Sequence, residues 1–287
     1  MFPENISTIV VTRTRNREHF LRRAALSLAE QTDKNFIWCI VNDGGDISSV
    51  EEIKLSFDTK MHIHVEHLEA NVGMEAAGNV GLEFAYQYGA EFAVLHDDDD
   101  SWNENFLAEM VQLLSSDQTA FGVVCDWLEI YEKLDKNGRI RETKRSKPFS
   151  AGELRLPLLA VRNRFPPIAF LFRVRAWKDV GRFDPTYPVL GDWDFNLRML
   201  FGGEILVCKQ TLSHQHIRDT SIGDQANSIR SKLHLHRQMK TRLVNHYARL
   251  GSAQKYSQLG VLLAMADQLE DVFKRQSLKE RLKRLFK

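Results

Sequence analysis

The sequence predicts an α/β fold, with a Rossmann-like, mainly parallel sheet flanked by helices and followed by a C-terminal helical extension. Its first half alternates short runs rich in β-branched residues with segments of helical periodicity, as βαβ units do. Polar or acidic residues directly follow several of these runs, where open α/β sheets bind ligands. From about residue 224 glycines thin out and helical patterns dominate. We therefore expect one domain over residues 1–222 and a helical extension over residues 223–287.

Each element is predicted by its own pattern. Residues 6–12 predict the first strand, and apolar residues spaced four apart within residues 19–31 predict a helix with one buried face. The run 36–41 predicts a second strand that ends in the turn-forming Asn-Asp-Gly-Gly. The other expected strands are residues 61–67, 92–95, 121–127, 168–174 and 204–208, and the other expected helices are residues 75–88, 102–114 and 192–201. Residues 133–147 predict an exposed excursion with a hairpin turn at residues 135–138.

The composition is that of an ordinary globular protein. Of its 287 residues, 43% are hydrophobic and 27% charged, and the net charge of +1 gives no general attraction to nucleic acid, so none is expected as a partner. Cys39, Cys125 and Cys208 lie in apolar runs without metal-site spacing, which predicts buried, reduced thiols and a cytoplasmic location. No segment has the pattern of a signal peptide or a membrane span, so we expect neither export by that route nor integral insertion.

The acidic run His96-Asp97-Asp98-Asp99-Asp100 follows a predicted strand. Adjacent carboxylates repel one another unless a cation is nearby, and a divalent ion is the simplest remedy. Carboxylate oxygens suit Mg²⁺ or Mn²⁺, and either ion can bridge the protein to a diphosphate. The alternative is a solvated acidic loop or a helix N-terminus, where aspartates cap free N–H groups. The position at a strand end favours the metal site.

Several motifs in order resemble those of the family 2 glycosyltransferases, which have the GT-A fold, over roughly residues 5–220. The motifs are residues 11–17 (Val-Thr-Arg-Thr-Arg-Asn-Arg, like the nucleotide loop after the first strand), 42–45 (like the Asp-Asp-Gly-Ser turn), 71–73 and 77–81 (like Asn-x-Gly and Ala-Arg-Asn-x-Gly), 95–102 (like the Asp-x-Asp-Asp-x-Trp strand end) and 191–198 (like the Glu-Asp segment with its later arginine). Each motif alone is weak support for the resemblance, but their occurrence together in the same order as in the family is strong support.

The resemblance implies an inverting, single displacement at the anomeric carbon of a nucleoside-diphosphate sugar. It implies Asp192 as the general base, which needs hydrogen-bond reach of the acceptor hydroxyl. A Mn²⁺ or Mg²⁺ ion on the diphosphate is implied, with Asp97, Asp99 and His216 as its ligands. Nucleotide or sugar contacts are implied for Thr12, Arg13, Thr14, Arg15, Asp43, Asn79, Asp97 and Asp98. The implied donor is a UDP- or dTDP-sugar, and the implied acceptor is a glycan or a lipid-linked saccharide.

Structural alternatives stand beside these roles. Asp192 could be a helix N-cap, Asp43 an Asx turn, and Arg13 and Arg15 solvated side chains. Asp100 is expected to cap the helix that begins near residue 102.

The chain departs from the family pattern at three positions. Arg15 replaces the usual tyrosine, so a guanidinium would stack on the base. Gly78 replaces the usual arginine, whose contact Arg13 or Arg17 would supply. Gly191 replaces the usual glutamate before the base.

Two further features carry open alternatives. His214 and His216 follow the last expected strand with a spacing that places both on one face of an extended segment, either near the diphosphate and metal or at the surface. Residues 269–287 predict a basic amphipathic helix, which could lie on an anionic membrane surface, pack on the domain or mediate self-association.

Two rival functions follow from the same residues. A nucleotidyltransferase would need a Gly-rich phosphate loop followed by lysine, and none is visible. The second rival function is a non-catalytic module that binds a nucleotide sugar or a glycan. The presence of both Asp99 and Asp192 argues against this function.

Overall fold

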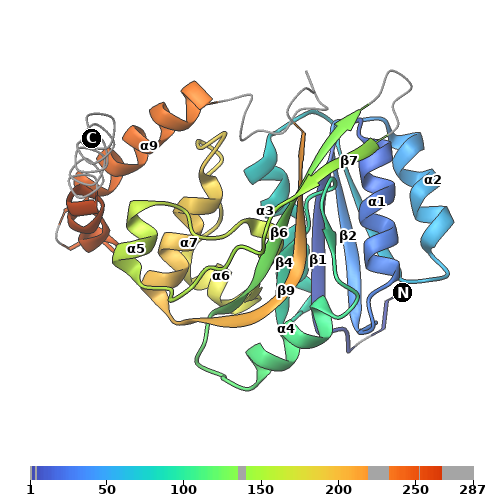
Figure 1. Ribbon diagram of the computed structural model, residues 1–287, viewed down its shortest axis with the longest axis horizontal. Coiled ribbons are helices and arrows are strands. Elements are labelled where there is room, and N and C mark those ends of the chain that lie inside the picture. Colours follow the sequence, from blue (N-terminus) through green and yellow to red (C-terminus); the bar gives the residue numbers. More distant parts are fainter. Residues whose placement is uncertain (1, 4, 135–139, 219–232, 252, 267–287) are drawn as a thin grey trace, which may run out of the picture.

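The computed structural model describes residues 2–3, 5–134, 140–218, 233–251 and 253–266. A nine-stranded sheet runs through the middle of the molecule and is flanked by helices (Figure 1). The strands are β1 (Thr8–Thr14), β2 (Phe36–Asp43), β3 (His62–Leu68), β4 (Phe92–Leu95), β5 (Ser101–Trp102), β6 (Gly122–Leu134), β7 (Ile140–Arg145), β8 (Phe170–Arg173) and β9 (Ile205–Arg218). The named helices are α1 (Glu18–Ala29), α2 (Ile47–Phe57), α3 (Met74–Tyr88), α4 (Phe106–Ser115), α5 (Leu156–Val161), α6 (Val174–Val180), α7 (Gly191–Gly202) and α9 (Leu233–Ala248), with a 3-10 turn at Pro167–Ala169.

The sheet is mainly parallel, as the alternating pattern predicted. Its strand order is β3-β2-β1-β4-β8-β6-β9-β5, and β7 pairs with β6. Strands β1 to β4 run parallel, β8 is antiparallel to both of its neighbours, and β6 is parallel to β9. Because β1, β2 and β4 are parallel neighbours, their carboxyl ends meet at one edge of the sheet, and the candidate site lies at this edge.

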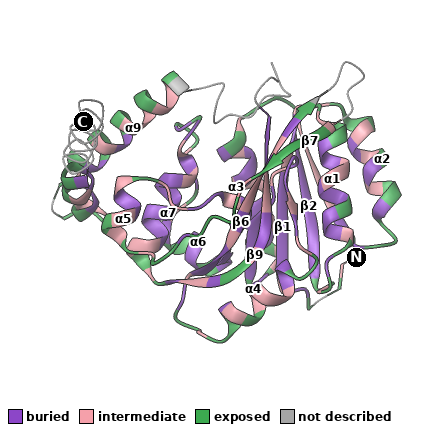
Figure 2. Ribbon diagram, viewed as in Figure 1, coloured by how far each residue is buried: buried purple, intermediate pink, exposed green. Residues whose placement is uncertain are grey.

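Burial explains why the central runs form strands. Every residue of β2 and of β4 is buried, as expected for parallel strands covered on both faces (Figure 2). In α1 the buried residues Phe20, Ala24 and Leu28 recur every four positions and form the face that meets the core. All three cysteines are buried, as their apolar surroundings in the sequence predicted.

Several boundaries differ from the sequence expectation. The last strand does not end near residue 208, because β9 continues to Arg218 and pairs along β6 across register shifts near Asp126. The expected helix at residues 102–114 begins only at Phe106, because residues 101–102 pair with β9 as β5. The predicted excursion at residues 133–147 is part of the β6–β7 hairpin, and its turn lies outside the described residues.

The described C-terminal residues are helical, as expected, and pack against the domain. Besides α9, residues 257–266 form a helix. Leu243, Tyr247, Leu259 and Leu263 are buried within the same core cluster as the sheet. None of the described helices is both long and apolar enough to cross a membrane. The basic tail of residues 269–287 lies outside the described residues.

Candidate active site

The first-strand loop and the acidic run meet because β1 and β4 are parallel neighbours. Val11 pairs with Leu95, and the N–H of His96 donates to the carbonyl of Val11 at 2.9 Å, which extends this alignment by one residue. Three residues beyond Val11, the Thr14 hydroxyl donates to Oδ2 of Asp98 at 2.8 Å. Thr14 and Asp98 are both buried. The predicted nucleotide loop and the acidic run therefore form one structural unit.

Arginine side chains surround the acidic run. The ion pairs are Arg13 with Asp97, Arg17 with Asp98 (2.8 Å) and Asp99 (2.7 Å), and Arg218 with Asp99. The Arg218 side chain is completely buried, and that of Arg13 is 9% exposed. The repulsion from which the sequence argument inferred a divalent ion is therefore relieved in this structure by guanidinium groups.

The pKa values of Asp98, Asp99 and Asp100 are shifted in different directions. Burial alone would raise the pKa of Asp99, but Arg17 and Arg218 hold it below the usual value. Burial raises the pKa of Asp98, with Arg17 opposing the shift and the charge of Asp99 adding to it. The pKa of Asp100 is also raised by burial and by the charges of its acidic neighbours. Among these three carboxylates, Asp99 is therefore the one whose ionised form the site favours.

Asp100 has a different role from the predicted helix cap. Its Oδ1 accepts a hydrogen bond of 2.8 Å from the N–H of His216, inside the sheet. The helix that it was expected to cap begins later, and Asn105 occupies its N-cap position. The cap prediction was wrong because residues 101–102 form a strand between Asp100 and the helix.

Asp43 anchors the loop before α3. Its carboxylate accepts from the N–H of Val72 at 2.7 Å and from that of Gly73 at 3.1 Å. The Asx turn at the end of β2 belongs to Asn42, whose Oδ1 accepts from the N–H of Gly45 at 3.0 Å. Asp43 is 6% exposed, so a nucleobase contact would require it to share or exchange these partners.

Thr12 and Asn79 are engaged by the framework. The Thr12 hydroxyl is buried and accepts from the indole N–H of Trp38 at 2.8 Å. The Asn79 amide donates to the carbonyl of Phe183 at 2.8 Å and accepts from the N–H of the same residue at 3.0 Å. The structure thus places these two side chains as supports of the site, whereas the partly exposed Arg15 remains in the loop that follows β1.

Asp192 lies in the first turn of α7. The N-cap position belongs to Leu190, in the left-handed region with φ 67°, so Asp192 is not the helix cap. Its Oδ2 accepts from the side-chain amide of Asn163 at 2.7 Å. Burial raises its pKa to about 6, the charge of Asp97 adds to the shift, and the N–H of Trp193 and the charge of Arg13 oppose it. Such a carboxylate is ionised at neutral pH yet basic enough to accept a proton.

Asp194, two residues later, has structural partners. It binds Nε and Nη2 of Arg198 at 2.9 and 2.7 Å, and its other oxygen accepts from the Tyr247 hydroxyl at 2.6 Å. The guanidinium of Arg198 also donates to the carbonyls that precede α7, those of residues 180–182. Asp194 therefore joins α7 to α9.

His214 and His216 lie within β9 and not after the last strand. Both side chains approach the Ser101 hydroxyl, with His216 Nε2 at 2.9 Å and His214 Nδ1 at 3.5 Å, as expected for residues two apart in an extended segment. The other ring nitrogen of His216 lies 2.7 Å from Oε1 of Glu132. Both nitrogens of His216 thus have protein partners. Across the part of the chain that the structure describes, no three or more His, Cys, Asp or Glu side chains are grouped to hold a metal ion.

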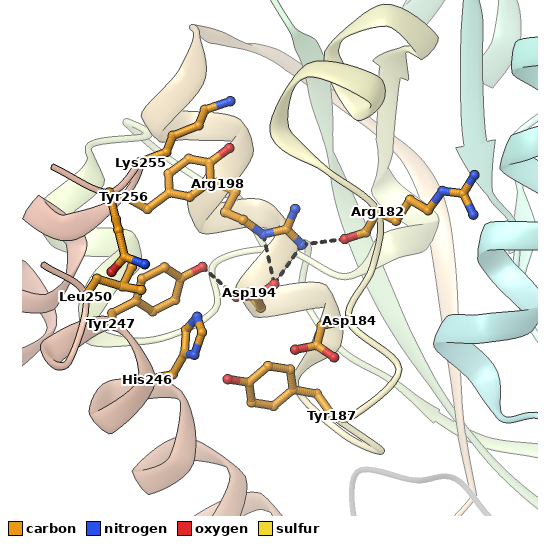
Figure 3. Close-up of a pocket in the computed structure, with 11 residues that line it drawn as sticks. Arg182, Asp184, Tyr187, Asp194, Arg198, His246, Tyr247, Leu250, Lys255 and Tyr256 are labelled. Atoms are coloured by element: carbon orange, nitrogen blue, oxygen red, sulfur yellow. Dashed lines mark hydrogen bonds and ion pairs between the residues drawn. The ribbon is translucent and has the colours of Figure 1, made fainter.

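A cavity of about 410 Å³ opens on the other side of α7, against the C-terminal helices (Figure 3). Arg182, Tyr187, Asp194, Arg198 and Tyr247 are among its lining residues. Its wall includes the hydrogen bonds that join Asp194 to its two partners. Neither Asp192 nor the acidic run lines it, so this cavity is separate from the candidate site.

Sequence reasoning did not identify three polar residues of this region. Glu75 is buried beside the start of α7, Asn163 binds Asp192, and Arg218 pairs with Asp99. Arg218 follows His216 with the period of a strand, so extending the last strand would have indicated it. Glu75 and Asn163 show no comparable signal, because their importance arises from contacts between elements far apart in the chain.

The comparisons agree with this architecture. TarS of S. aureus, residues 1–349 in complex with UDP-GlcNAc, has a TM-score of 0.67 at 19% identity, covering 91% of this chain and 71% of that one. A second structure of TarS residues 1–349 gives a TM-score of 0.64 at 18% identity, covering 90% of this chain and 69% of that one. The mannosyltransferase PcManGT of Pyrobaculum calidifontis, in complex with GDP-Man and Mn²⁺, gives 0.56 at 14%, covering 92% and 80%. A search of curated proteins gives no match.

These structural neighbours establish the GT-A fold that the sequence motifs implied. The sequence profile of glycosyl transferase family 2 matches residues 9–179, which include all of β1 except Thr8, the acidic run and β8. This match spans more than half of the chain. The chain therefore belongs to glycosyl transferase family 2.

Proposed function

We propose that the protein transfers a sugar, with inversion, from a nucleoside-diphosphate sugar to a hydroxyl of a glycan or lipid-linked saccharide. Membership of family 2 supports glycosyl transfer. TarS has been crystallised with UDP and UDP-GlcNAc, and PcManGT with GDP-Man, which supports a nucleotide-sugar donor. We infer a UDP- or dTDP-sugar as the donor and, from the buried free thiols, a cytoplasmic site of action.

The observation that carries this proposal is the convergence of Asp192 with the acidic run. Arg13 pairs with Asp97 and donates to the carbonyl of Met74, and the next residue, Glu75, lies against Gly191, the neighbour of Asp192. The charges of Asp97 and Arg13 accordingly influence the pKa of Asp192. A carboxylate placed beside a diphosphate-binding edge fits the general base of a direct displacement. Asp192 would take the proton of the acceptor hydroxyl, the acceptor oxygen would bond to the anomeric carbon, and the departing diphosphate would keep the electrons of the broken C–O bond.

The donor set fits a divalent cation through carboxylate oxygens. The side chain of Asp97 is 29% exposed and that of Asp99 is 10% exposed, and each is paired with an arginine. We propose these two residues as the ligands of Mn²⁺ or Mg²⁺, and PcManGT with its Mn²⁺ supports the choice of metal. When bound, such an ion neutralises charge on the departing diphosphate. His216 is the weaker candidate because both ring nitrogens already have partners.

Arginines complete the proposed donor site. Arg13 lies near the end of β1 and Arg17 in the loop that follows it, both paired with the acidic run, so their guanidinium groups are placed to neutralise a diphosphate. We propose that Arg15 stacks on the base, that Asp98 and Thr14 face the ribose or sugar, and that Asp43 reaches the base. Thr12 and Asn79 keep their structural partners and act indirectly.

The decisive test is turnover of a panel of nucleotide sugars with Mn²⁺, together with Asp192→Asn. We expect hydrolysis or transfer with at least one UDP- or dTDP-sugar, and loss of that activity in the variant. If no donor in a broad panel reacts and the substitution changes nothing, enzymatic function is refuted and a nucleotide-sugar or glycan-binding module remains.

A further inference from the structure

The residue before the proposed base has no side chain, and a glutamate from another helix fills that space. A Cβ atom built on Gly191 would lie 2.5 Å from Oε1, 2.6 Å from Cγ and 2.9 Å from Cδ of Glu75. Gly191 is not among the glycines with positive φ, so its backbone does not require glycine. A larger residue at position 191 would therefore have to displace the side chain of Glu75.

Glu75 is held in a charged setting. It lies in the first turn of α3, after Gly73, and is 6% exposed. Burial raises its pKa to about 7, the charge of Arg13 opposes this shift, and the charges of Asp192 and Asp97 add to it. Arg13 also donates to the carbonyl of Met74 at 3.2 Å, so the same guanidinium ties β1 to the start of α3.

A second glycine, Gly78, lies beside Arg13. A Cβ atom on Gly78 would lie 3.4 Å from Cδ and 3.7 Å from Nη1 of Arg13. These are ordinary van der Waals distances, so Arg13 packs beside position 78, whereas Glu75 occupies the space that a side chain at position 191 would need. Arg13 and Glu75 carry opposite charges and attract each other. The contacts of Arg13 and Glu75 thus bring together the end of β1, the start of α3 and the start of α7, where Asp192 lies.

We propose that Glu75 is a positioning residue that sets the placement of Asp192 by occupying the space beside Gly191. The groups that surround Asp192 are then Asn163, which donates a hydrogen bond to it, and the charged Arg13, Glu75 and Asp97. Without the side chain of Glu75, the first turn of α7 loses its contact with α3, and Asp192 moves relative to the acceptor hydroxyl. This inference rests on the proposed role of Asp192 as general base.

The contact itself is tested by a thermal double-mutant cycle, which needs no substrate. Gly191→Ala overpacks the contact, and we expect it to lower Tm by about 3 °C or more in the wild-type background. In the Glu75→Ala background the same substitution should lower Tm by less than about 1 °C, because the obstructing side chain is gone. Gly251→Ala is the matched control, since its Cβ would meet only Gln254 at 3.9 Å. Equal losses in both backgrounds would overturn the proposal.

The positioning role is tested by steady-state kinetics on a donor that the wild-type protein turns over. We expect Glu75→Ala to lower kcat at least tenfold while the donor KM changes less than about threefold, because misplacing a catalytic group affects the chemical step. Glu75→Gln keeps the shape and should restore kcat to within about threefold. Exposed Glu69→Ala is the matched control and should change neither constant.

The outcomes separate the two proposals. A wild-type protein without turnover on any donor refutes the proposed function, and the role of Glu75 falls with it. A fully active protein whose kcat is unchanged by Glu75→Ala refutes the role of Glu75 alone. A Gln variant as impaired as the Ala variant refutes positioning by shape.

Discussion

Replacing Asp192 by asparagine should abolish turnover and at the same time stabilise the fold. Loss of a general base typically costs 10²- to 10⁴-fold in rate, so we expect a fall in kcat/KM of about that size. The pKa of the buried carboxyl rises from 3.8 to about 6 on folding. The native state thus binds the proton more tightly than the unfolded chain, and stability falls as pH rises between these two values. Ionised Asp192 therefore costs the fold up to about 3 kcal/mol at pH 7.

The amide cannot ionise, so the variant should regain that free energy. For a chain of this length the gain corresponds to a rise in Tm of up to about 5 °C. The hydrogen bond from Asn163 can be kept, because the amide introduced at position 192 still offers a carbonyl oxygen. The assays are donor turnover with Mn²⁺ and thermal unfolding at pH 7, with exposed Asp58→Asn as the control. A variant that retains activity within threefold, or that melts below the wild type, would refute the reasoning.

Other perturbations have equally specific expected outcomes. The wild-type kcat/KM should rise about tenfold from pH 5 to pH 7, because Asp192 must be ionised with a pKa of about 6, and a flat profile contradicts this. Asp99→Asn should abolish the extra Tm increase that Mn²⁺ adds to UDP, and a persistent increase would place the metal elsewhere. Tyr247→Phe should cost about 1–3 kcal/mol in urea unfolding, since buried Asp194 loses a donor, whereas an unchanged midpoint would make that bond dispensable. Gly81→Ala should cost about 1–3 kcal/mol in the same assay, because its Cβ would lie 2.4 Å from Val11, and a tolerated alanine would disprove this contact.

The parts of the fold that could be predicted are those with local signals. The run at residues 92–95 was predicted with its observed bounds, because four apolar residues between polar neighbours have a clear start and end. The acidic run was correctly placed at the end of that strand. In contrast, the length of β9 could not be read from its sequence. Its second half mixes His214, Gln215, His216 and Arg218 into a strand that pairs with β6 across register shifts.

The position of the acidic run at a strand end was predictable, but its electrostatic surroundings were not. Acidic residues at a strand end indicated an ion, yet the sequence could not show that Arg218 pairs with Asp99 across 119 positions. Gly191 is a second example, because the sequence showed it only as a departure from a motif. Its close contact with Glu75 joins two helices far apart in the chain, and no sequence pattern indicates such a contact.

The first turn of α7 bears both Asp192, the proposed base, and Asp194, which binds Tyr247 of α9, so a single helix carries the proposed base and the attachment of the C-terminal helices. Substitutions on the buried face of α9, remote from any nucleotide, should therefore reduce turnover while leaving donor affinity nearly unchanged. A chain shortened to residues 1–222 would expose the apolar surface that Leu243 and Tyr247 now cover. Attempts to define a minimal catalytic fragment of this protein should accordingly retain the chain at least through residue 266.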